Sequence, residues 1–74
     1  EKMLLIPAAA VVVQGQLTAI FILDAQKTAR FRLIRTGRIF DNGVEVISGL
    51  MEGERFVVRL PDRLEDGVRV EVAP

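Results

Sequence analysis

Residues 44–58 read VEVISGLMEGERFVV, and this stretch decides the fold class of the 74-residue chain. Its two ends are rich in β-branched and aromatic residues, which fit the pleated surface of a sheet. Gly49 and Gly53 lie between these ends, where a tight connection requires backbone conformations with positive φ. The stretch therefore predicts a strand, a turn held by two structural glycines, and a second strand.

Short apolar runs separated by turn residues continue through the rest of the chain, and they show no helical periodicity. Val, Ile, Phe and Thr dominate these runs, which is typical of an all-β protein. We therefore predict an all-β fold, a small β-barrel or sandwich of about six to seven short, mostly antiparallel strands. The expected strands cover residues 3–6, 10–13, 18–24, 28–39, 44–48, 55–60 and 68–72.

The pair Asn42-Gly43 is the strongest local signal for a hairpin, because both residues accept the positive φ that a type I′ turn requires. We expect this turn to join strand 28–39 to strand 44–48 in an antiparallel pair. Two residue pairs fix the expected register: Ile39 opposite Val46, and Arg38 opposite Ile47.

The other connections are marked by glycine, proline or aspartate, whose backbone preferences favour turns. We expect turns at 14–16, 24–27 and 51–54. The longest loop runs from Leu60 to Gly67, a further structural glycine. Within it we expect one irregular helical turn at 62–66, held in place by an inward-facing Leu64.

The chain contains neither cysteine nor histidine, which excludes a disulfide, a thiolate nucleophile and a typical zinc site. Ser48 has no histidine to act as its base, so we interpret its hydroxyl as a turn-stabilising group. Neighbouring acids at 52–54 and 62–66 lie in expected turns, where carboxylates are solvated, and their spacing lacks the pattern of a calcium loop. We therefore predict no catalytic residue, no metal site and no cofactor.

Ten basic and ten acidic residues give a net charge of zero, which disfavours a globally basic nucleic-acid binder. The charges are nevertheless separated along the chain. Residues 28–40 hold four arginines and no acid, whereas residues 41–54 hold four acids and no base. We expect some Arg–Glu pairs across or diagonal to the hairpin that joins the two segments.

The four arginines of the expected strand 28–39 are our candidate partner-binding residues: Arg30, Arg32, Arg35 and Arg38. Three interpretations of this row remain open. The arginines could be the exposed face of a strand, a protein-contact patch of the kind that arginine favours, or a nucleic-acid surface that also carries Phe31.

Two apolar, β-prone runs, 4–6 and 11–13, would promote aggregation at an open sheet edge. We expect each run to pair internally, or to be covered by another part of the parent chain or by a second copy. The longest apolar run, 3–13, is interrupted by Pro7 and is well short of the ~20 residues of a spanning helix. No secretory signal is visible, and the chain opens directly on an expected strand, so we interpret it as a fragment.

Four stretches in this order resemble the C-terminal, membrane-proximal domain of periplasmic adaptor proteins, also called membrane fusion proteins, of tripartite efflux pumps. In the third stretch Arg32, Ile34 and Gly37 match the family's pattern of an arginine, an apolar residue and a glycine. Phe56 departs from the pattern, since valine is commoner there. The stretches are LIPAAAV (5–11), TAIFILD (18–24), ARFRLIRTG (29–37) and residues 44–58, and the ending LEDGVRV (64–70) also fits.

The resemblance implies a single membrane-proximal β-domain at residues 1–74, within a longer adaptor chain. It implies a non-catalytic assembly module that docks on an inner-membrane transporter, often of the resistance–nodulation–division type, and links it to an outer-membrane channel through parts absent here. It also implies neighbouring adaptor protomers as partners, and a place in the periplasm, attached to the inner membrane.

The family completes this domain with a strand from the N-terminal part of the chain. We therefore expect the isolated fragment to self-associate at its N-terminal edge. The alternative function is a nucleic-acid-binding small β-barrel.

Overall fold

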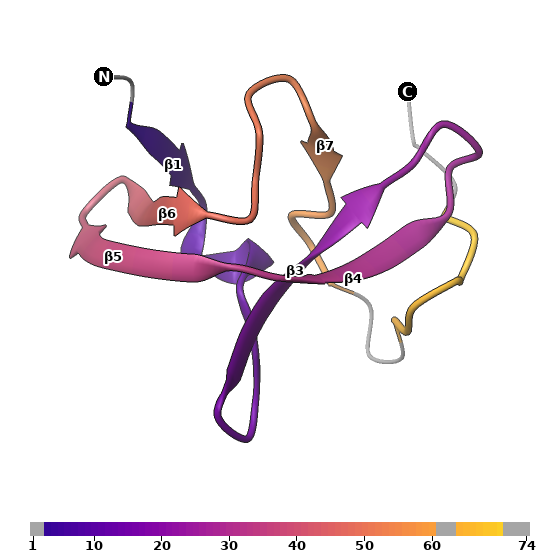
Figure 1. Cartoon of the computed structure of the whole chain (residues 1–74), viewed down its shortest axis with the longest axis horizontal. Coiled ribbons are helices and arrows are strands. Elements are labelled where there is room, and N and C mark those ends of the chain that lie inside the picture. Colours follow the sequence, from indigo (N-terminus) through magenta and orange to yellow (C-terminus); the bar gives the residue numbers. More distant parts are fainter. Residues whose placement is uncertain (1–2, 61–63, 71–74) are drawn as a thin grey trace.

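The computed structural model describes residues 3–60 and 64–70 and contains seven short strands and one 3-10 helix (Figure 1). Every strand pairing among these residues is antiparallel, and the predicted all-β fold is confirmed. The elements are β1 (Leu4–Ile6), η1 (Ala8–Ala10), β2 (Val12–Gln14), β3 (Leu17–Leu23), β4 (Ala29–Leu33), β5 (Arg35–Phe40), β6 (Gly43–Ser48) and β7 (Arg55–Phe56).

The strands form two small sheets that share one long, bent segment. One sheet has the order β1-β6-β5, and the other has the order β2-β3-β4 with β7 also paired to β3. β4 and β5 follow each other in one sweep of the chain (Figure 1). Between them, the N–H of Ile34 donates to the carbonyl of Thr18 at 3.0 Å, and the chain passes from one sheet to the other. The single strand predicted at 28–39 is therefore wrong, because a strand that changes sheets must break its ladder at the corner.

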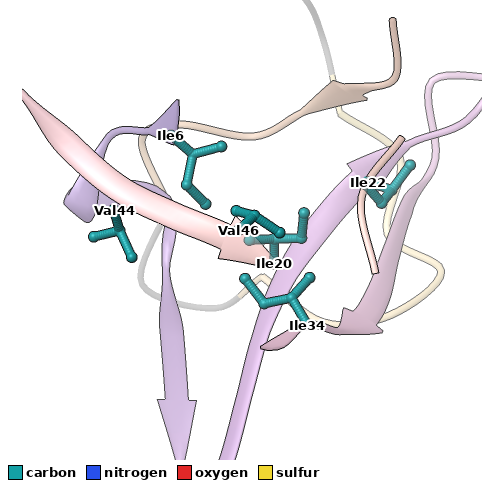
Figure 2. Packing of buried hydrophobic residues seen from close by; sticks show 6 residues of the cluster. All are labelled: Ile6, Ile20, Ile22, Ile34, Val44 and Val46. Carbon is teal, nitrogen blue, oxygen red and sulfur yellow. The ribbon is translucent and has the colours of Figure 1, made fainter. Parts of the chain in front are cut away.

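The core lies between the two sheets and is made of β-branched side chains (Figure 2). β1 and β6 are in a register that pairs Ile6 with Val44, so both side chains lie on the same face. Burying one such side chain contributes about 1.5–3 kcal/mol, which makes this cluster the main source of stability. Its members are Ile6, Ile20, Ile22, Ile34, Val44 and Val46.

β3 is buried on both faces, which explains why its sequence is continuously apolar rather than alternating. On the face turned away from the core cluster, Phe21 lies opposite Phe31 with ring centroids 5.4 Å apart at 65°, an edge-to-face contact. The outer edge of β4 is covered by residues 66–70. The N–H of Ala29 donates to the carbonyl of Val68, and the N–H of Gly67 donates back to Ala29, both at 2.7 Å.

The predicted register of the β5–β6 hairpin is wrong. The turn residues are Asp41 and Asn42, so that Phe40 pairs with Gly43 and Ile39 pairs with Val44. Asn42 does not adopt positive φ, and the turn is therefore not of type I′.

The physical reason lies in a neighbouring strand that local sequence does not reveal. Gly43 has φ +154°, and a Cβ atom there would lie 2.8 Å from the carbonyl oxygen of Ile6. The close approach of β1 therefore places the glycine inside β6 rather than in the turn. Further along the hairpin, Thr36 pairs with Val46, and the register shifts on both sides of this pair.

Several other expected elements differ in their bounds. The run 10–13 divides into η1 and β2, and strand 55–60 shortens to the two residues of β7. The expected strand 68–72 is a single bridge between Thr28 and Arg69, and residues 71–72 lie outside the described part. Residues 64–66 are not helical, and the remainder of the expected helical turn, 62–63, is not described. Leu64 is half-buried.

Both apolar runs suspected of forming open edges pair inside the domain, β1 with β6 and β2 with β3. The second edge of each strand pairs with no other strand in residues 3–60 and 64–70. The described residues hold no helix of the length and hydropathy that crossing a membrane requires.

Candidate partner-contact surface

The four candidate arginines all lie on the bent β4–β5 segment, but the structure divides them into two pairs with different surroundings. Arg30 and Arg32 belong to β4, and both are held by carboxylates of the domain itself. Arg35 and Arg38 belong to β5 and are exposed. The two pairs therefore differ in what they can offer to another molecule.

Arg32 ties β4 to the turn at 51–54. Its Nη1 donates to both carboxylate oxygens of Glu54, at 2.6 and 2.7 Å, and approaches the carbonyl of Gly49 at 3.4 Å. Glu54 also accepts the N–H of Met51 at 2.8 Å. The hydrogen bond from Arg32, followed by that from Met51, lowers the pKa of Glu54. This carboxylate therefore stays ionised and remains bound to Arg32 and to the N–H of Met51.

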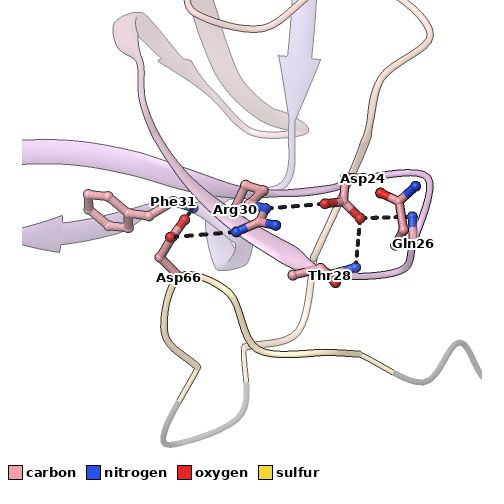
Figure 3. Close-up of polar contacts among 6 residues, drawn as sticks. All are labelled: Asp24, Gln26, Thr28, Arg30, Phe31 and Asp66. Carbon is pink, nitrogen blue, oxygen red and sulfur yellow. Dashed lines mark hydrogen bonds and ion pairs between the residues drawn. The ribbon is translucent and has the colours of Figure 1, made fainter.

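Asp24 organises the turn between β3 and β4 (Figure 3). One carboxylate oxygen accepts the N–H groups of Gln26 and Thr28, both at 2.9 Å, while the other accepts from Nε of Arg30 at 3.1 Å. The Thr28 N–H is the largest cause that lowers the pKa of Asp24. Asp66 approaches the same arginine at 3.9 Å.

Arg35 and Arg38 make no side-chain hydrogen bond or ion pair with any residue in the described ranges. The expected Arg–Glu pairing between the two segments therefore occurs at Arg32 and Glu54, and not between β5 and β6 among the described residues. Glu45 accepts the backbone N–H of Arg38 at 3.0 Å instead of binding its guanidinium group. Glu45 is occupied in this way because the register shift brings its carboxylate over the β5 backbone.

The β5–β6 hairpin that carries these two cations also exposes large apolar side chains. Ile39 of β5 is 81% exposed, and Ile47 of β6 is 58% exposed. No described strand pairs with the outer edge of β5. We call Arg35, Arg38, Ile39 and Ile47 together the β5 surface.

The glycines differ in why their positions require glycine: some combine positive φ with close packing, and others have positive φ alone. Gly49 has φ +100°, and a Cβ atom there would lie 2.6 Å from the carbonyl oxygen of Leu33. Gly53 has φ +91° within open space, and Gly67 has φ +88°. Gly37, which matched the family's pattern but was not among the expected structural glycines, lies directly beneath the Glu45 carboxylate. A glycine inside a strand is a recognised signal for such a close approach, and it could have found this position.

The sequence also missed three carboxylates that hold the β4 arginines. Asp24 could have been found, because an aspartate that opens a hairpin loop commonly accepts N–H groups two or more residues later. Glu54 lies in the acidic segment that was expected to supply partners, although β4 rather than the β5–β6 hairpin receives it. Asp66 accepts the N–H of Phe31 at 2.8 Å from 35 positions away, which no local pattern predicts.

The described residues contain no cluster of three or more acidic side chains that could hold a metal ion. Asp62, one of the acids weighed for calcium, lies outside the described part. The carboxylates of Asp24 and Glu54 serve as hydrogen-bond acceptors for the fold. The features on which an interaction can be built are therefore the unpaired cations and the exposed apolar side chains.

Comparison with known proteins shows the family to which this chain belongs. A family of domains described as "RND MFPs, C-terminal permuted SH3 domain" matches residues 2–63. The chain belongs to this family of RND membrane fusion protein domains. The matched range contains all seven strands and all four candidate arginines, and the resemblance inferred from the sequence is confirmed.

A curated relative of this RND membrane fusion protein domain is the "Multidrug resistance protein MdtA" of Erwinia amylovora. It is 28% identical over 74 residues, which is all of this chain and 18% of the relative. The chain therefore spans less than a fifth of the length of that protein.

Proposed function

We propose that this chain is a non-catalytic assembly module of a periplasmic efflux adaptor. It docks on an inner-membrane transporter of the resistance–nodulation–division class, and the adaptor links that transporter to an outer-membrane channel for export across the envelope. Membership of the RND membrane fusion protein family and the similarity to a multidrug resistance protein support this role. The whole adaptor would lie in the periplasm, attached to the inner membrane, beside neighbouring protomers.

The observation that carries the proposal is the β5 surface, where two arginines have no partner within the described chain. Arginine is enriched at protein interfaces because its planar guanidinium group binds carboxylates in two-point contacts and is weakly hydrated. Docking through Arg35 and Arg38 breaks no internal ion pair, whereas Arg30 and Arg32 would first have to leave Asp24 and Glu54. The β5 pair is therefore the preferred contact.

The exposed isoleucines strengthen this choice. A protein-contact site typically combines apolar side chains in its centre with polar groups at its rim. Ile39 and Ile47 lose water-exposed apolar area when a partner covers them, while Arg35 and Arg38 supply charge complementarity. The partner chemistry that fits is an acidic patch beside apolar side chains.

The experiment reverses both charges of the β5 surface in the full-length protein. Arg35→Glu/Arg38→Glu is expected to reduce drug tolerance of cells that depend on this protein, because the docking contact becomes repulsive. Circular dichroism of the purified variant checks that the domain remains folded. Unchanged tolerance in a folded variant at normal abundance would remove the β5 surface from the docking site.

A matched control reverses two other exposed arginines. Arg59→Glu/Arg69→Glu changes the net charge by the same amount, and neither side chain has a partner among the described residues. This control is expected to leave tolerance unchanged. An equal loss in both variants would mean that net charge, not the β5 surface, is responsible.

The side chains that suggested nucleic-acid binding, Phe31 and the β4 arginines, already make contacts within the domain. Phe31 lies against Phe21 and is half-buried, so it offers no free stacking platform. Arg30 and Arg32 are held by carboxylates. No described observation favours this alternative over the adaptor role.

We further propose that the chain studied in isolation self-associates at its N-terminal edge. The outer edges of β1 and β2 lack a described partner strand, and unpaired edges of apolar strands add further strands. Light scattering is expected to show an average mass that increases with concentration. Leu5→Lys places a charge on β1 and is expected to reduce the association, and a clean monomer at high concentration would contradict the proposal.

A further inference from the structure

An open groove lies at the end of the molecule away from the β5 surface. It has a volume of about 490 Å³ and runs between the β3–β4 turn and the turn at 51–54. Ile22 and Leu23 of β3 provide its apolar lining. Lys27 and Arg55 also line it, from the β3–β4 turn and from the start of β7.

The charges in this groove are not balanced. Three cations, Lys27, Arg32 and Arg55, face two carboxylates, Asp24 and Glu54, which leaves a net charge of +1. Both carboxylates are already held by arginines of β4, at 3.1 and 2.6 Å. Lys27 and Arg55 have no side-chain partner within the described residues. The groove therefore presents two free cations beside apolar side chains.

The backbone of Lys27 provides a second, independent observation. It is the only non-glycine residue of the described chain with positive φ, at +60°. Glycine adopts this conformation without strain, and a lysine does so only at a cost. The turn offsets part of this cost, because the N–H of Lys27 donates to the carbonyl of Asp24 at 3.0 Å and the carbonyl of Lys27 accepts from the N–H of Val70 at 2.7 Å. Its ammonium group makes no hydrogen bond or ion pair with any residue in the described ranges. Strained backbone positions of this kind gather at functional sites.

The chemistry of the groove selects among anions. A phosphate group is usually held by several free backbone N–H groups that converge on one point. Here the N–H groups of Gln26 and Thr28 are both taken by Asp24. The two free cations instead come from different elements, with an apolar lining between the walls, which fits carboxylates carried on an extended chain.

We propose that this groove binds an extended, acidic segment of a partner protein. Its carboxylates contact Lys27 and Arg55, and an apolar side chain of the segment lies against the half-buried Leu23. The groove shares no residue with the β5 surface, so the proposal for the groove can be tested independently of docking on the transporter.

The test measures binding of a fluorescein-labelled decapeptide of alternating glutamate and valine to the full-length protein, by fluorescence anisotropy at low salt. Exposed ion pairs contribute modestly, so Lys27→Gly is expected to weaken binding about fivefold and Lys27→Gly/Arg55→Gln about tenfold. Added salt is expected to weaken the wild-type complex. Arg59→Gln, which removes one charge outside the groove, is expected to change affinity less than about twofold.

Lys27→Gly also separates binding from folding, because it removes the charge while relieving the backbone. Hydrogen exchange of the Thr28 and Ala29 amides is expected to remain as slow as in the wild type or slower. Three results would overturn the proposal: unchanged affinity in the double variant, equal binding of a lysine–valine decapeptide, or binding to phosphatidylglycerol vesicles without binding to the peptide.

Discussion

The two halves of the bent β4–β5 segment each carry two arginines, but only those of β4 are bound by carboxylates of the domain. On β4, Arg30 and Arg32 are held by Asp24, Asp66 and Glu54, and residues 66–70 cover the strand edge. On β5, both arginines lack a side-chain partner, and the outer edge pairs with no described strand.

The difference shows that an arginine row is not one site. An arginine that is bound by a carboxylate from a turn or from residues 66–70 helps to hold the fold together. An arginine that no such carboxylate reaches can bind another molecule. For an adaptor domain this separates residues that keep β4 in place from residues that can meet a partner.

Gly49 provides the largest expected effect. Its carbonyl approaches Arg32, and a side chain at this position would meet the carbonyl of Leu33 just before the chain changes sheets. Gly49→Ala is expected to destabilise the domain by about 3 kcal/mol or more, because it combines positive φ with a clash between the added Cβ atom and the backbone. Urea unfolding followed by circular dichroism measures the loss.

Gly53→Ala is the matched control, since this glycine has similar φ but open space around it. It is expected to cost about 1 kcal/mol, the penalty of positive φ alone. Equal losses at Gly49 and Gly53 would mean that the close approach to Leu33 does not matter.

A smaller effect distinguishes the two arginine pairs directly. Arg32→Gln is expected to lower the urea midpoint, because it removes both hydrogen bonds to Glu54. Arg35→Gln is expected to change stability by less than about 0.5 kcal/mol, as for surface residues without partners. If Arg35→Gln destabilised the domain as much as Arg32→Gln, the division between β4 and β5 would be wrong.

The smallest expected effect is a dependence of stability on acid. The pKa values of Asp24 and Glu54 lie below their usual 3.8 and 4.5 in the folded domain. Groups whose pKa is lowered by folding stabilise the folded state above their unfolded pKa, and they lose this contribution as the pH falls through the folded value. The free energy of unfolding is therefore expected to decrease as the pH drops below 4.5. Asp24→Asn/Glu54→Gln is expected to flatten this decrease, and a variant that keeps it in full would contradict the assignment.

Much of the fold could be predicted from the sequence because its causes are local. The β-branched runs became strands, and the connections at 24–27 and 51–54 lie where aspartate and glycine indicated them. The register of the β5–β6 hairpin could not be predicted, since Gly43 is required by the approach of Ile6 from another strand.

The sequence proposed four candidate arginines, but it could not predict that the fold divides them into two pairs. Carboxylates were expected to meet some of the four. Which carboxylate meets which arginine depends on where the chain returns: Asp66 reaches β4 from near the end of the described chain, and Glu45 is diverted to a backbone N–H. These long-range placements are invisible to periodicity and spacing.

The most direct test of the central claim is site-specific photo-crosslinking in cells that express the full-length protein with its inner-membrane transporter. A photoreactive amino acid replaces Arg38 on β5 in one variant and Arg30 on β4 in another. We predict a crosslink to the transporter from position 38 and none from position 30. A crosslink from position 30 alone, or none from either position in an efflux-competent protein, would contradict the account.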